Sequence, residues 1–179
     1  MVGFDWRRLA GKAWLGFNRA AVHRPSIAFV ADTGMRVWIQ EHLASWLACP
    51  MRVFHRHPDQ PSLRDLDPGC VEYARLPHWS VDLDAGLGFR NSSAFAALNL
   101  LDLLGYDPIY LIGIDMVPEG GVYRTWYAPP VEDGGHAMPH VLADLEVYAQ
   151  PRASVVNLNP ASGVRRWSFG DLDAALEAV

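Results

Sequence analysis

The amino-acid sequence predicts an α/β protein, with a three-layer, Rossmann-like domain built around a mostly parallel sheet. Short apolar strands alternate with segments of helical periodicity, which is the order that a parallel sheet requires. Some strands are apolar at every position, as expected for strands covered on both faces. Several of these strands also end on Asn or Asp. In open α/β sheets, ligands bind at that carboxyl edge.

The first half of the chain is expected to hold strands and one helix in alternation. Pro50 ends the helix, because proline cannot continue it. The loop at 58–68 is polar and carries prolines. The strand at 71–76 alternates in polarity and is expected to be an edge strand or half-exposed. The expected order is strand 12–18, strand 26–32, helix 34–47, strand 51–56, loop 58–68, strand 71–76 and loop 77–89.

In the second half, Asn91, Ser92 and Ser93 are candidate caps for a helix that begins at Ala94, because their side-chain oxygens can accept free backbone N–H groups. This helix is apolar on more than one side and ends at Gly105. The segment 117–138 has no periodicity and is expected to be a long functional loop or lid. The remaining elements are strand 109–114, helix 139–148, strand 154–159 and helix 170–178, and residues 1–179 are expected to form a single domain.

Composition and charge exclude several classes of protein. The net charge of −5 argues against a protein whose main partner is nucleic acid. No apolar run reaches membrane-spanning length, and the N-terminus does not resemble a signal peptide. Cys49 and Cys70 lack metal-ligand spacing, so both are expected to be structural thiols in a reducing compartment. We therefore expect a cytoplasmic protein, with an exposed sheet edge that favours a homo-oligomer.

Small polar side chains at strand ends are the candidate binding residues. Because the carboxyl ends of parallel strands meet at one edge, these groups are expected to converge and to bind ribose hydroxyls, a base edge or a sugar. The alternative is that strand ends tolerate polar residues where they meet solvent. The candidates are Asn18, Asp32, Asp115, Asn157 and Asn159.

The long loop supplies the candidate catalytic residues. His136 is a candidate general base, because imidazole titrates near neutrality. Tyr123, Arg124 and Tyr127 are candidates to stabilise a phosphate leaving group, or to pack the loop onto the domain. No metal site is predicted, since Pro139 separates His136 from His140. His55 and His57 alternate along a strand and are expected to be exposed.

Several motifs together resemble a known superfamily. They are Gly-Phe-Asn-Arg-Ala at 16–20, Asp32, Asn-Ser-Ser at 91–93 before an Ala-rich helix, Leu-Gly-Tyr-Asp-Pro-Ile-Tyr-Leu-Ile-Gly-Ile-Asp-Met at 104–116 and Val-Asn-Leu-Asn-Pro-Ala-Ser at 156–162. The chain resembles, over most of its length, the Rossmann-like superfamily that includes bacterial sialyltransferases using CMP-activated sugars, motility accessory factors that glycosylate flagellin, archaeal-type 6-hydroxymethylpterin diphosphokinases and phage or prophage proteins of unknown function.

The resemblance implies a role for each matching residue. Asn18 and the turn at 91–93 would contact the nucleotide, Asp115 would close the floor of the site, Tyr123 and Tyr127 would hold the leaving phosphate, and His136 would be the base. The chain departs from the superfamily because no strand with a Gly-x-Gly-x-Ser turn precedes Leu9. Either the sequence begins downstream of the true start, or part of the nucleotide site has been lost.

Three functions follow as expectations. The first is a glycosyltransferase-like enzyme that moves a sugar from a nucleotide-activated, CMP-linked donor to a small-molecule or glycan acceptor without a further cofactor. The second is diphosphoryl transfer from ATP, which would need Mg²⁺ with Asp32 or Asp115 as a ligand. The third is an inactive phage-encoded binding or assembly protein with the same fold, which the missing first strand favours.

Overall fold

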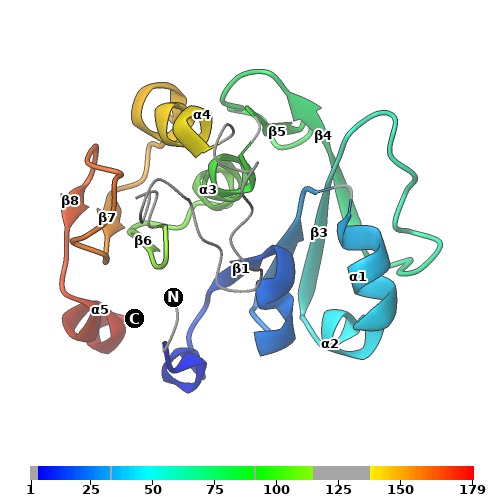
Figure 1. Ribbon diagram of the computed structural model, residues 1–179, viewed down its shortest axis with the longest axis horizontal. Coiled ribbons are helices and arrows are strands. Elements are labelled where there is room, and N and C mark those ends of the chain that lie inside the picture. The colour runs from blue at the N-terminus through cyan, green and yellow to red at the C-terminus, as the bar shows by residue number, and fades with distance from the viewer. Residues whose placement is uncertain (1–3, 33, 91, 115–137) are drawn as a thin grey trace.

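A computed structural model describes residues 4–32, 34–90, 92–114 and 138–179 of the chain (Figure 1). Its strands form a five-stranded sheet with the order β1-β2-β3-β4-β5 and a three-stranded sheet with the order β6-β7-β8, and every pairing is parallel. This arrangement confirms the predicted α/β, Rossmann-like class. The parallel sheet is interrupted between β1 and β6, a break that the sequence did not predict.

The first sheet holds strands β1 to β5, and short helices connect them. Their bounds are η1 Trp6–Leu9, β1 Leu15–Phe17, η2 Asn18–His23, β2 Ile27–Val30, α1 Met35–Glu41, α2 Leu43–Leu47, β3 Met51–Arg56, β4 Val71–Leu76 and β5 Leu87–Gly88. β3 and β4 have the predicted bounds, and β4 is half-exposed although it lies between β3 and β5. The predicted helix 34–47 is two helices that meet at His42.

The second part of the chain begins with α3, which crosses from β5 to β6. The remaining elements are α3 Ser93–Leu103, β6 Ile109–Leu111, α4 Met138–Ala143, the π-helix η4 Asp144–Tyr148, β7 Val155–Asn157, β8 Ser168–Phe169 and α5 Leu172–Ala178. The predicted helix 139–148 is therefore an α-helix followed by a π-helix. No helix in the described part of the chain is both long enough and apolar enough to cross a membrane.

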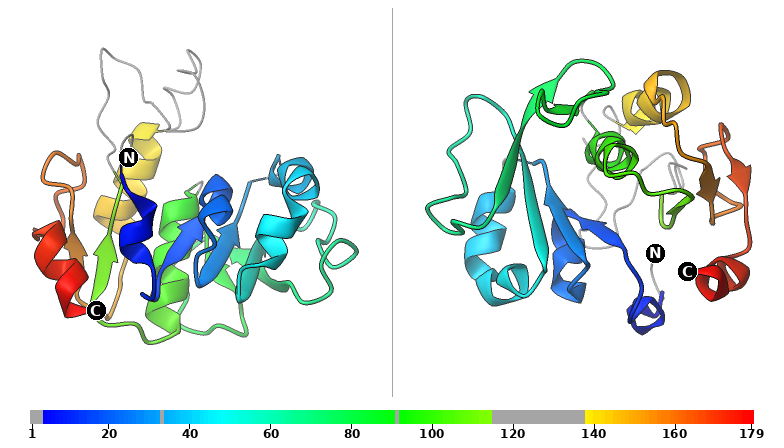
Figure 2. Two further views of the ribbon diagram at one scale, coloured as in Figure 1. Left: turned by 90° about the horizontal axis from the view of Figure 1, so that it is seen from below. Right: turned by 180° about the vertical axis from the view of Figure 1, so that it is seen from behind.

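Two apolar layers cover the five-stranded sheet. On one face, α1 and α2 pack against Ala28, Val30 and Phe54. On the other face, α3 packs against Ile27 and Phe29. The alternation of these β2 residues between the two faces follows from the period of two along a strand. The sheet thus forms the middle of three layers, as predicted (Figures 1 and 2).

α3 is the central helix of the molecule. Its residues Ala96, Ala97 and Leu100 belong to the core of the first sheet. Phe95 and Leu98 belong to a second core with Ile109 and Val155, which lie in the three-stranded sheet. Both cores bury side chains of this one helix, which confirms the prediction of a helix that is apolar on more than one side.

β5 is short, and its contact with α3 explains why the sequence did not reveal it. A Cβ at Gly88 would lie 2.6 Å from the backbone oxygen of His78 and 2.9 Å from the ring of Phe95. Glycine is required for this close approach. The side chain of Asn99 in α3 accepts a hydrogen bond from the Gly88 N–H at 2.8 Å. A glycine and a buried amide are not strand signals in a sequence.

Three predictions about individual side chains can be assessed. His55 is fully buried, so the expectation that it is exposed is wrong. Its ring occupies the interior between Phe29 and Phe89, and its Nε2 lies 3.0 Å from the oxygen of Leu87. The prediction overlooked that β3 is covered on both faces. Cys49 and Cys70 are free and buried, and burial raises the pKa of the Cys70 thiol to about 12, as fits structural thiols.

Candidate functional site

Asn18 and Asp32 meet at the carboxyl edge of the first sheet. β1 and β2 pair in parallel with Phe17 opposite Phe29, so the residues that follow the two strands lie beside each other. The Nδ2 of Asn18 donates a hydrogen bond to Oδ2 of Asp32 at 2.6 Å. The predicted convergence of strand-end side chains is therefore confirmed for this pair.

The N-terminus of α3 adds a third residue to this group. Ser92 is the N-cap, because its Oγ accepts a hydrogen bond from the Phe95 N–H at 3.1 Å. The next residue, Ser93, directs its hydroxyl to Oδ1 of Asp32 at 3.5 Å, which is a weak hydrogen bond. We call Asn18, Asp32 and Ser93 the edge cluster. It joins the ends of two strands to the positive end of a helix dipole.

Asn18 combines a left-handed backbone conformation with a buried side-chain oxygen that has no partner in the described part of the chain. Its φ of 54° lies in the left-handed region, which non-glycine residues seldom adopt. Its side chain is buried, and its Oδ1 has no hydrogen-bond partner among the described residues. Because an unsatisfied buried oxygen is costly, a ligand that donates a hydrogen bond would find a preformed acceptor here.

Asp32 is exposed to solvent, yet its surroundings disfavour its charge. Burial by nearby protein atoms raises the pKa of its carboxyl, and the hydrogen bonds from Asn18 and Ser93 oppose this effect only in part. The residue is exposed as a whole, but its carboxyl group lies between Asn18 and Ser93 and is crowded by them. An accessible carboxylate of this kind can accept hydrogen bonds from hydroxyl groups of a ligand.

Arg75 on β4 is a neighbour of this site that the sequence did not identify. Its guanidinium donates hydrogen bonds to the backbone oxygen of Ala31 and, at 3.1 Å, to that of His55. It also lies 4.0 Å from the centre of the Phe89 ring. These contacts fix a positive charge that, like the hydrogen bonds from Asn18 and Ser93, opposes part of the rise in the pKa of Asp32. The sequence shows Arg75 only as a basic residue in a strand of alternating polarity, and this does not reveal that its side chain reaches the end of β2.

A buried acid, Asp144, pairs with the arginine that precedes α3. Arg90 donates a hydrogen bond through Nε to Oδ1 of Asp144 at 3.1 Å, and its guanidinium stacks on Tyr148 at 3.7 Å. Burial raises the pKa of the Asp144 carboxyl. Asp144 begins the π-helix, and the sequence analysis did not select it. The pair connects η4 to the segment that leads into α3.

Two other predicted strand-end residues, Asn157 and Asn159, lie at the end of β7 and in the loop after it. Asn157 is buried, donates from Nδ2 to the oxygen of Val164 at 3.2 Å, and accepts from the Asn159 N–H at 3.1 Å. Asn159 in turn accepts from the Ala161 N–H at 3.0 Å. These hydrogen bonds shape the loop after β7 and belong to the second sheet.

Several predicted residues lie outside the described part of the chain. The candidate nucleotide-binding residues among them are Asn91 and Asp115. The predicted loop 117–138 is outside it too, apart from Met138, which begins α4. All four candidate catalytic residues are in this group: Tyr123, Arg124, Tyr127 and His136. Among the residues that are described, no group of three or more His, Cys, Asp or Glu side chains could hold a metal ion.

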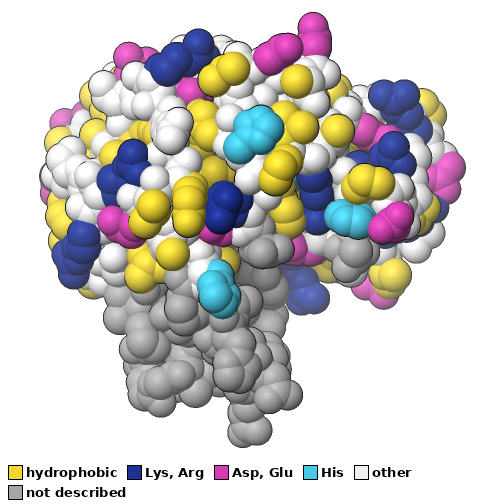
Figure 3. Space-filling view, turned by 90° about the horizontal axis from the view of Figure 1, so that it is seen from above, with side chains coloured by type: hydrophobic (Ala, Val, Ile, Leu, Met, Phe, Trp, Pro, Cys, Tyr) yellow, Lys and Arg dark blue, Asp and Glu magenta, His cyan; other side chains and the backbone are white. Residues whose placement is uncertain are grey.

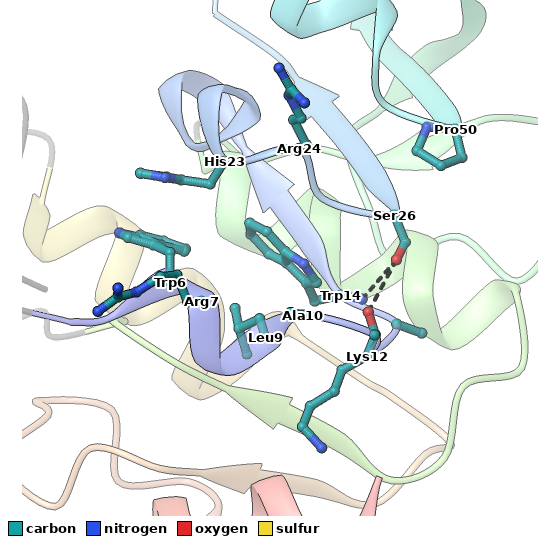
Figure 4. Close-up of a pocket in the computed structure, with 12 residues that line it drawn as sticks. Trp6, Arg7, Leu9, Ala10, Lys12, Trp14, His23, Arg24, Ser26 and Pro50 are labelled. Carbon is teal, nitrogen blue, oxygen red and sulfur yellow. Dashed lines mark hydrogen bonds between the residues drawn. The ribbon is translucent and has the colours of Figure 1, made fainter.

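A separate pocket of about 670 Å³ lies at the opposite, amino-terminal edge of β1 and β2 (Figure 4). Trp6, Trp14 and His23 form an aromatic side of it, and the rings of Trp6 and His23 stack at 4.3 Å. Lys12 and Arg24 also line the pocket. Lys12 donates to the oxygen of Val179 at 2.9 Å, so its charge is used to anchor the C-terminal segment.

The surface in Figure 3 shows Lys and Arg side chains interspersed with Asp and Glu, and no continuous basic area forms on that face.

No protein-family model, curated protein or solved structure matches this chain. The assignment of a function therefore rests on the chemistry of the edge cluster.

Proposed function

We propose that this protein is a glycosyltransferase-like enzyme that transfers a sugar from a nucleotide-activated donor. The observation that carries the proposal is the edge cluster of Asn18, Asp32 and Ser93 beside the N-terminus of α3. Hydroxyl groups of a ribose or sugar would donate to the carboxylate of Asp32 and to Oδ1 of Asn18, which has no partner in the described part of the chain.

The N-terminus of α3 supports the placement of a phosphate. Ser92 caps the N–H of Phe95, while the N–H groups of Ser93 and Ala94 have no acceptor among the described residues. Free N–H groups and the helix dipole both favour an anion at this position. A donor could then place its hydroxyl groups on the edge cluster and its phosphate at the helix.

Catalytic roles in the proposal remain those predicted from the sequence. His136 would take the proton of the acceptor hydroxyl as the bond between the sugar and the donor phosphate breaks, and Tyr123, Arg124 and Tyr127 would stabilise the departing phosphate. Full turnover in a His136→Ala variant would contradict this assignment.

Nucleotide binding is the first test of the proposal. Thermal unfolding of the full chain should be followed with CMP, CDP, UDP, GDP and ATP, each with and without Mg²⁺. A ligand at about a hundred times its Kd adds about 2.7 kcal/mol of stability, or roughly 5 to 10 °C for a chain of this length. We expect such a shift with one pyrimidine nucleotide in the absence of metal.

Variants of the edge cluster should remove most of that shift. Asp32→Asn keeps the size of the side chain but loses the negative acceptor, and Asn18→Gly keeps the left-handed backbone but loses the amide. Asp84→Asn is the matched control, because Asp84 is exposed and precedes β5 at the other edge of the sheet. A full rise in unfolding temperature in both edge-cluster variants would overturn the site. A Mg²⁺-dependent rise with ATP alone would favour diphosphoryl transfer. No rise with any nucleotide would contradict both enzyme functions.

A further inference from the structure

The side chain of Arg75 crosses the carboxyl ends of two neighbouring strands. Arg75 is the penultimate residue of β4, and its Nε donates to the backbone oxygen of His55 in β3 at 3.1 Å. One of its terminal nitrogens donates to the backbone oxygen of Ala31, which follows β2 and precedes Asp32. The guanidinium therefore lies at the carboxyl edge of the sheet, next to the backbone of a member of the edge cluster.

Arg75 also lies on the face of the sheet that α3 covers. Tyr73, two residues earlier in β4, packs against the core that α3 forms with this sheet. Because side chains alternate between the two faces of a strand, Arg75 projects on the same side as Tyr73. Its guanidinium lies 4.0 Å from the centre of the Phe89 ring, which joins the same core. The charge of Arg75 is thus fixed on the side of the sheet where α3 lies.

The charge of Arg75 has no ion-pair partner in the described part of the chain. Its guanidinium donates to two backbone oxygens, and its other N–H groups have no acceptor among the described residues. Arg75 is half-buried, and burial lowers the pKa of its guanidinium, an effect that the charge of Asp32 opposes only in part. Because a buried cation is costly unless an anion compensates it, this position favours the binding of an anion.

We propose that Arg75 binds an anionic group, a phosphate or a carboxylate, of the ligand whose hydroxyl groups occupy the edge cluster. Arginine N–H groups form charge-assisted hydrogen bonds with both kinds of anion. Asp32 would accept from a hydroxyl group of the ligand, while the unused N–H groups of Arg75 donate to its anionic group. The inference rests on the proposed function for the hydroxyl groups, whereas the anion site itself rests on the contacts of Arg75.

Asp32 and Arg75 together select a ligand that carries a hydroxyl group and an anionic group. A nucleoside has the hydroxyl groups of its ribose but no anion, so it would leave the guanidinium as it is in the free protein. A nucleotide would add charge-assisted hydrogen bonds to Arg75, which are stronger than hydrogen bonds between neutral groups. We therefore expect Arg75 to distinguish a nucleotide from its nucleoside, whereas Asp32 accepts from both.

Titrations with inorganic phosphate and with acetate test the anion site on the full, unmodified chain. At constant ionic strength, NMR follows the Nε–H signal of Arg75, which is identified by magnetisation transfer from the ring of Phe89. The Nε–H of Arg52, which pairs with Asp67, is the internal control. We expect a saturable change at Arg75 with phosphate, and a change with acetate alone would make the anionic group a carboxylate. No saturable change with either anion, or an equal change at Arg52, would overturn the inference.

Arg75→Gln then connects the anion site to the ligand. Arg64→Gln is the matched control, because it removes the same charge from an exposed residue between β3 and β4. Of the nucleotides tested by thermal unfolding, the one that stabilises the wild-type protein should bind at least about tenfold more weakly to Arg75→Gln, as the loss of a charge-assisted hydrogen bond implies. Its nucleoside should bind both variants equally.

The failure of this inference is distinguishable from the failure of the proposed function. Equal binding of the nucleotide to Arg75→Gln and Arg64→Gln would overturn the role of Arg75 and leave the proposed function intact. If no nucleotide stabilises the wild-type protein, the proposed function fails, and the titrations with phosphate and acetate still decide whether Arg75 forms an anion site. Those titrations need no variant, so they decide it even if Arg75→Gln does not fold.

Discussion

At the scale of single residues, Asn18 shows how one side chain links fold and site. Its backbone turns from β1 into η2 with a positive φ, which asparagine tolerates better than most residues. Its amide nitrogen donates to Asp32, and its oxygen has no partner among the described residues. Buried polar atoms and strained backbone cluster at functional sites, where surrounding structure enforces them. The coincidence of both at a sheet edge distinguishes Asn18 from a polar residue that only meets solvent.

The buried His55 predicts how stability depends on pH. Burial lowers its pKa to about 4, from an ordinary value near 6.5. Between these values the unfolded chain binds more protons than the folded chain, so the free energy of unfolding rises with pH. A shift of this size corresponds to about 3 kcal/mol, gained as the pH rises from about 4 to about 6.5.

Urea unfolding at several pH values between 4 and 7 measures this effect. The control is His55→Gln, which can still donate to the oxygen of Leu87 but does not titrate. The raised pKa of Asp32 makes the free energy of unfolding fall as the pH rises, which is the opposite sign. Because the wild-type protein and the variant both contain Asp32, the difference between their pH dependences isolates the effect of His55. The same pH dependence in both proteins would show that His55 is protonated as readily in the folded state as in the unfolded state.

At the scale of elements, the start of α3 depends on the cap at Ser92. Ser92 is buried, so Ser92→Ala leaves the N–H of Phe95 without an acceptor and should cost about 1 to 2 kcal/mol of stability. Ser92→Gly should cost less, because glycine is a better N-cap than alanine. Midpoints of urea unfolding give both values.

Asp171→Ala provides the matched control for this cap. Asp171 caps α5 in the same way, through the N–H of Ala174 at 2.8 Å, but it is exposed near the end of the chain. Water can replace its hydrogen bond, so we expect a smaller loss than in Ser92→Ala. Two results would mean that the Ser92 hydrogen bond does not set the stability of α3. One is a loss of stability in Asp171→Ala that equals or exceeds the loss in Ser92→Ala. The other is a greater loss in Ser92→Gly than in Ser92→Ala.

The elements that could be predicted are those with a local signal. Continuous apolar runs marked β2 and β6, alternation marked β4, and the Asn-Ser-Ser cluster marked the start of α3. β5 and β8 were missed because two-residue strands carry no periodicity. Within the site, Asn18, Asp32 and Ser93 were predictable because they follow or precede such elements. Arg75 and Asp144 were not, since only tertiary contacts bring them to their places.

At the scale of the whole molecule, two sheets share one helix. Leu98 of α3 packs into the core of the three-stranded sheet, and Leu100 packs into the core of the five-stranded sheet. The N-terminal segment adds a second connection, because Lys12 donates to the oxygen of Val179 and Arg8 pairs with Asp173 in α5. The described N-terminal segment at η1 and the C-terminal helix α5 therefore lie close together, on the side away from α4 (Figure 1).

This architecture predicts that the sheets unfold as one cooperative unit. Leu98→Ala and Leu100→Ala should each cost about 2 to 5 kcal/mol, the usual range for a buried leucine. Although each side chain contacts one core, a weakened α3 should destabilise both, so hydrogen exchange measured by mass spectrometry should accelerate in β2 and β7 in either variant. Val37→Ala on the exposed face of α1 should change neither strand. Faster exchange confined to β7 in Leu98→Ala and to β2 in Leu100→Ala would instead mean that the break between β1 and β6 divides the molecule into two independent units.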